Sequence, residues 1–121
     1  MRPAPVAIIA VAVVVFLAVG GYLIFGRGSG GGGKPVTVDV SVTGATMRPA
    51  TISVHQDDRV TVNLTADKRE EIHVHGYDII FSVERAGDTV THTFTADKTG
   101  NFDIEIEDTG TGIGSLVVQP R

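Results

Sequence analysis

Cysteine is absent from the chain of 121 residues. A lipid anchor attached through cysteine is therefore excluded, although the absence neither requires nor forbids an oxidising compartment. The sequence also lacks a nucleophile elbow, a metalloprotease helix motif, and a phosphate-binding glycine loop with its lysine and serine. We therefore predict that the protein is not an enzyme.

Charge is absent from residues 5–25, where the Tyr22 hydroxyl is the only polar side-chain group among 21 residues. A helix of this length spans about 31 Å, which matches a bilayer core of about 30 Å. We expect a short cytoplasmic tail at residues 1–4 and a transmembrane helix, acting as a signal anchor, at residues 5–25. A cleaved signal peptide is the alternative, because residues 18–20 are small, but its apolar region is usually only about 7 to 15 residues long.

Residues 26–35 are rich in glycine and predict a flexible linker between the membrane and a domain at residues 36–121. That domain holds all 14 acidic residues and seven basic ones, a net charge of −7. An acidic domain binds nucleic acid poorly and is repelled by an anionic membrane surface. The charged residues on either side of the predicted transmembrane helix barely favour one orientation of that helix in the membrane. We expect a single-pass protein of the cell membrane whose C-terminal domain is extracytoplasmic and binds an unknown protein partner.

The domain shows the two-residue period of half-buried strands and no helical period. This pattern predicts an all-β Greek-key sandwich or barrel. Turns at residues 56–58 and 98–100 each predict a hairpin between the strands that flank them. About eight short strands are expected, at residues 36–43, 52–54, 60–64, 71–75, 79–83, 89–95, 101–107 and 115–119.

Four segments of the domain, taken in their order along the chain, resemble a known family. Residues 47–54 read MRPATISV, residues 57–62 read DDRVTV, residues 71–78 read EIHVHGYD, and residues 99–104 read TGNFDI. In order and spacing they resemble the cupredoxin family, the fold of plastocyanin-like copper proteins. The resemblance implies a Greek-key β-sandwich, a first histidine ligand near residues 71–78, and a loop with cysteine, histidine and methionine ligands after the fourth segment.

The sequence departs from that family at the copper ligands. Blue copper sites need a thiolate, and this chain has no cysteine. The position expected for it falls on an isoleucine in the alternating run of Phe102, Ile104 and Ile106, and residues 108–114 contain no histidine or methionine. The resemblance therefore implies a cupredoxin-like fold without a blue-copper site, similar to uncharacterised membrane-tethered members of the superfamily.

Two histidines on one predicted strand are the candidate metal ligands. His73 and His75 are two residues apart, so both imidazoles can reach one ion, and Glu105 or Glu107 from another strand can complete a nitrogen and oxygen site for Cu(II) or Zn(II). The other interpretation is that both histidines lie on the outer face and pair across strands with acidic residues. His92 alternates with apolar residues and is predicted to be a hydrogen-bonded core histidine.

Three functions remain open from the sequence. The first is a binding or structural module that needs no cofactor. The second is a cysteine-free site for copper or zinc. The third is an immunoglobulin-like adhesion domain that resembles cupredoxins by coincidence.

Overall fold

The computed structural model describes residues 33–121. The predicted tail, the predicted transmembrane helix and most of the predicted linker lie outside these residues. Among the residues described, no helix is long and apolar enough to cross a membrane. The described chain forms nine strands, namely β1 (Pro35–Thr43), β2 (Thr46–Arg48), β3 (Thr51–His55), β4 (Arg59–Ala66), β5 (Glu70–Val74), β6 (Ile79–Val83), β7 (Thr89–Thr95), β8 (Gly100–Ile106) and β9 (Thr111–Gln119).

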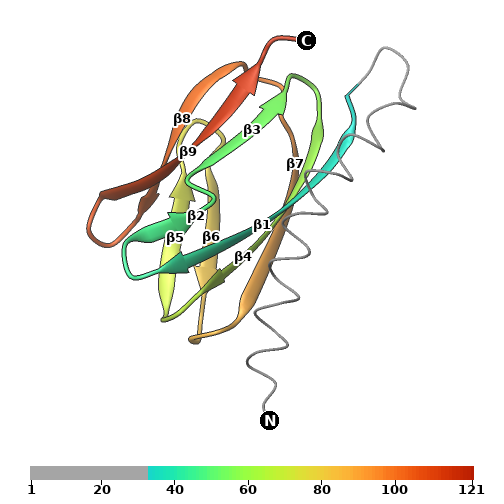
Figure 1. Cartoon of the computed structure of the whole chain (residues 1–121). Coiled ribbons are helices and arrows are strands. Elements are labelled where there is room, and N and C mark those ends of the chain that lie inside the picture. The colour runs from blue at the N-terminus through green and yellow to red at the C-terminus, as the bar shows by residue number, and fades with distance from the viewer. Residues whose placement is uncertain (1–32) are drawn as a thin grey trace.

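The strands form two sheets (Figure 1). One has the order β2-β1-β4-β7 and the other the order β3-β9-β8-β5-β6. The pairs β1–β4 and β3–β9 are parallel, and the remaining pairs are antiparallel. The predicted all-β class and two-sheet architecture are confirmed, with nine strands in place of about eight, because the short β2 was not foreseen.

The two predicted hairpins are wrong. β3 pairs with β9, whereas β4 pairs with β1 and β7 in the other sheet, so the turn at residues 56–58 crosses between the sheets. The turn at residues 98–100 likewise joins β7 to β8 across the sandwich. Alternating apolar residues show that a strand has one buried face, but they do not identify the strand beside it.

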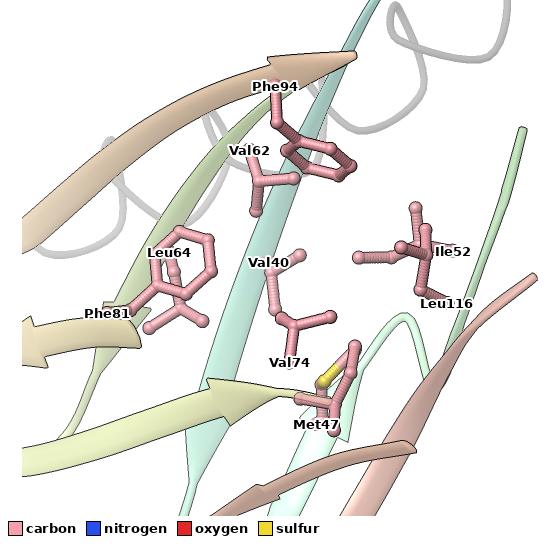
Figure 2. A pocket seen from close by; sticks show the side chains of 10 residues that line it. Val40, Met47, Ile52, Val62, Leu64, Val74, Phe81, Phe94 and Leu116 are labelled. Carbon is pink, nitrogen blue, oxygen red and sulfur yellow. The ribbon is translucent and has the colours of Figure 1, made fainter. Parts of the chain in front are cut away.

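The core fills the space between the sheets. Figure 2 shows side chains from the two sheets pointing toward one another, among them Val40 and Leu64 from one sheet and Ile52, Phe81 and Leu116 from the other. The void between them is about 10 Å³. This is about the smallest space that holds one water molecule, so the centre of the sandwich has no room for a ligand.

A buried carboxylate ties together three distant parts of the chain. Asp58, which is 0% exposed, accepts hydrogen bonds from the backbone N–H groups of Lys34 (3.0 Å) and His55 (2.9 Å). It also accepts one from the guanidinium of Arg121. These contacts connect the segment before β1, the end of β3 and the C-terminus. Full pairing is what allows a carboxylate to be buried at this crossing point.

Asp58→Asn is expected to lower the free energy of unfolding by about 2 kcal/mol, because the amide loses the charge and offers one acceptor oxygen to three donors. Urea denaturation measures the change. Asp57→Asn is the matched control, since Asp57 is exposed and asparagine also accepts its φ of 71°. Equal stability of the two variants would contradict the role assigned to Asp58.

Candidate functional site

The outer face of β5 carries the two candidate histidines. Ile72 and Val74 point into the core, where they are 0% and 5% exposed. Because side chains alternate along a strand, His73 is placed on the opposite face. His75 directly follows β5, and its backbone N–H donates to the carbonyl of Asp103, 2.9 Å away, which keeps it in line with the strand.

The neighbouring strand β8 brings acidic side chains to the same face. β5 and β8 are antiparallel, with His73 opposite Glu105 and with Ile72 and Val74 opposite inward-facing isoleucines. Glu107 directly follows β8, and its backbone N–H donates to the carbonyl of Glu71. The register of one strand pair therefore puts histidines and carboxylates side by side.

Each histidine contacts a carboxylate diagonally across the two strands. His73 Nδ1 lies 3.1 Å from Glu107 Oε1, and His75 Nε2 lies 2.9 Å from Glu105 Oε2. The two imidazole rings are 4.5 Å apart between centroids and inclined by 41°. The interpretation in which the histidines pair across strands on the outer face is thus confirmed.

Three of the four predicted ligands also form a compact group. His73, His75 and Glu105 each offer one ligand atom, and these atoms lie within 4.8 Å of one another. Their side chains are 18%, 46% and 24% exposed. Glu107 is not part of this group but contacts His73 from the side. The group is half-buried, open to solvent, and built from two strands of one sheet.

The loop between β5 and β6 fixes the end of the site. Gly76 has a φ of 84°, and a Cβ atom there would lie 2.4 Å from the ring of Phe102. The Tyr77 hydroxyl donates to the carbonyl of Lys98 (2.7 Å) and accepts from its N–H (2.8 Å). Burial raises the pKa of Tyr77 above its ordinary value. These contacts attach the loop after His75 to the segment between β7 and β8.

Asp78 is a member of the site that the sequence did not single out as a ligand. Its Oδ1 lies 3.8 Å from His73 Nε2, and its side chain is 94% exposed. Asp78 has a φ of 53° and lies in the turn between β5 and β6. The only signal for it was its place at the end of the HVHGYD run.

His92 lies apart from this group, as predicted. Its Nε2 is 2.9 Å from the carbonyl oxygen of Ile80, and its ring packs edge-on against Phe81 with 4.8 Å between centroids. Because β7 and β6 belong to different sheets, this hydrogen bond closes one side of the sandwich. His92 therefore has a structural role.

Comparison with known proteins identifies the fold. An apo copper binding protein solved by NMR shares 14% identity at a TM-score of 0.59, over 70% of this chain and 88% of that one. The metal binding domain of the Cu(I) exporting ATPase CopA of Streptococcus pneumoniae D39 also shares 14% at 0.59, over 69% and 85%. Auracyanin A, a blue copper protein of Chloroflexus aurantiacus, shares 17% at 0.56, over 70% and 99%. The chain has a cupredoxin-like fold. No protein-family model and no curated protein sequence matches it.

A blue-copper centre does not fit this cupredoxin-like domain. The chain supplies no thiolate, and Ile104 and Ile106, in the run where the cysteine is expected, are buried hydrophobic residues 2% and 8% exposed. The donors that the structure brings together are imidazole nitrogens and carboxylate oxygens. This set suits Cu(II) and Zn(II), and it does not suit a site that depends on sulfur.

His75 is expected to titrate above pH 6.5, because its hydrogen bond to Glu105 raises its pKa and nearby carboxylates add to the effect. The pair then contributes to stability below pH 6.5, and the contribution is lost as the pH rises through the folded pKa. NMR titration of the imidazole protons measures this value. Glu105→Gln should move the pKa of His75 back toward 6.5 further than Glu107→Gln does; equal shifts would refute the assignment.

Proposed function

We propose that the protein is a non-enzymatic, cupredoxin-like module that binds Cu(II) or Zn(II) through His73, His75 and Glu105 at the outer surface of the cell membrane. The observation that carries the proposal is the grouping of these three ligands within 4.8 Å on two strands of one sheet. Two histidines on one strand and a carboxylate from the adjacent strand give a metal ion three donor atoms. A further coordination position of the ion stays open to solvent.

The spacing of the ligands suits a metal ion after small side-chain movements. Ligands bound at about 2.1 Å in a tetrahedral site are about 3.4 Å apart, and adjacent ligands in a square-planar site are about 3.0 Å apart. The His75–Glu105 distance of 2.9 Å already matches the second value. From a separation of up to 4.8 Å, the ligand atoms have to approach one another by roughly 1.5 Å to reach these values.

Surrounding charge favours a cation at this face. Glu107 contacts His73 Nδ1 and can hold the ring in place while its other nitrogen faces an ion, an arrangement typical of metal-bound histidine. Asp78 and Asp103 add negative charge beside the site, and the domain as a whole carries a net charge of −7. Such a field raises the local concentration of cations.

Binding of Cu(II) or Zn(II) is expected to raise the melting temperature of the full chain, purified in detergent and stripped of metal. At a concentration about 100-fold above the Kd the native state gains about 2.7 kcal/mol, which corresponds to roughly 10 °C or more for a domain of this size. The double variant His73→Ala, His75→Ala should lose the shift, and Glu105→Gln should weaken binding about 10-fold or more.

The matched control is His55→Ala, which removes a histidine two strands away from β8 in the same sheet and leaves the site intact. Elemental analysis counts the bound metal. No saturable binding below about 10 μM, or an equal shift in the double variant, would exclude the proposed metal site.

A second candidate function is binding of a protein partner without metal. The observation that favours it is that each histidine pairs with a carboxylate of the protein itself. This function predicts that purified protein contains no stoichiometric metal and that chelation leaves its melting temperature unchanged. The metal titration therefore distinguishes the two.

The membrane location rests on the sequence. The uncharged run at residues 5–25 and the glycine-rich residues 26–35 support an anchored domain held away from the bilayer. Protease added to intact cells is expected to digest the domain. Digestion only after lysis would reverse the topology, and recovery of the domain in the soluble fraction would support signal-peptide cleavage.

A further inference from the structure

A polar hollow lies at the end of the sheet where β5 begins. Because β5 is antiparallel to both β6 and β8, its start lies beside the ends of these two strands. The hollow has a volume of about 260 Å³. It is lined by residues from these three places, namely Arg69, Glu70, Glu71, Ser82, Val83, Glu84 and Asp108. Four carboxylates and a single guanidinium give it a net negative charge.

Glu70 is the residue that distinguishes this hollow from an ordinary acidic surface. It is 5% exposed and lies on the inward-facing side of β5, in line with Ile72 and opposite Val83. Both of its carboxylate oxygens are buried, and neither has a hydrogen-bond partner in the part of the chain that the structure describes. A buried carboxylate without partners is costly, in contrast to Asp58, which has three donors.

We propose that the hollow binds a small organic cation, a guanidinium or primary ammonium group, that donates hydrogen bonds to Glu70 and is flanked by Glu84 and Asp108. A planar guanidinium can donate two parallel hydrogen bonds to one carboxylate, which satisfies both unpaired oxygens once the buried Glu70 side chain turns toward the hollow. The site is separate from the histidine group, and the proposal does not depend on a metal there.

An organic cation fits the hollow better than a metal ion. Within residues 33–121, the histidine group is the one set of three or more potential ligands whose atoms lie within 4.8 Å of one another. The carboxylates of the hollow therefore do not form a group of three around one ion. A volume of about 260 Å³ corresponds to several water molecules or one small organic cation.

The electrostatics of Glu70 agree with an incoming cation. Burial raises its pKa, the charges of Asp67 and Asp108 add to that effect, and the charge of Lys68 opposes it. Neither Lys68 nor Arg69 forms an ion pair with Glu70 within the described residues. Arg69 lies in the segment before β5 and also lines the hollow. A cation from outside is thus the group that would compensate this carboxylate.

The test is titration of the full chain in detergent with agmatine, a guanidinium on an aliphatic stem, followed by calorimetry and NMR at pH 7.5. Saturable binding in the millimolar range or tighter is expected. Glu70→Gln should weaken it at least 10-fold and Asp108→Asn several-fold, whereas Arg69→Gln should strengthen it by removing a like charge. The double variant His73→Ala, His75→Ala should bind agmatine as the wild type does.

The source of the cation is resolved by a second probe, the peptide acetyl-Gly-Arg-Gly-amide. Tighter binding of the peptide than of agmatine identifies a partner protein's side chain, and the reverse order identifies a free small cation; either order supports the site. NMR spectra establish that each variant is folded, and Glu84→Gln provides a further variant if Glu70→Gln is not. No saturable binding up to 10 mM agmatine, equal binding by Glu70→Gln, or displacement of agmatine by stoichiometric Ca²⁺ would overturn the proposal.

Discussion

The site depends on one constraint, which is that β5 and β8 must each bury alternate side chains. Ile72 and Val74 face Ile106 and Ile104 across the strand pair, and all four are buried. A slip of one residue in either strand would put polar side chains into the core and isoleucines into solvent. Burial of these apolar residues therefore fixes the register, and the register fixes the distances between histidines and carboxylates on the other face.

The same strand pair explains why the domain has two different sites with carboxylates, the histidine group and the hollow at Glu70. On the outer face of β5, His73 contacts a carboxylate that directly follows the neighbouring strand. Glu70 occupies the inward-facing series that continues with Ile72, but it lies at the end of the sheet, where no donor from residues 33–121 reaches it. In the first arrangement each histidine has a carboxylate partner. In the second, the described part of the chain supplies no partner for the carboxylate.

The sequence patterns predicted where strands begin and end better than they predicted which strands pair with each other. Residues 79–83 and 89–95 are strands with the expected bounds, because their alternation reflects the burial of one face within each strand. The hairpins predicted at residues 56–58 and 98–100 failed, because the chain crosses between sheets at both turns. Glu70 was not singled out and Asp78 was not identified as a neighbour of His73, since burial without a partner and proximity in space are properties of the packed domain.

The sequence by itself determined the absence of a thiolate, the all-β class and the histidine and carboxylate candidates, because these follow from residue types and a two-residue period. Only the tertiary structure decided that His73, His75 and Glu105 converge while Glu107 contacts the group from the side. The physical reason is that convergence depends on diagonal contacts between twisted strands. Those contacts are set by which strands pair, and pairing is set by the core that both sheets fill together.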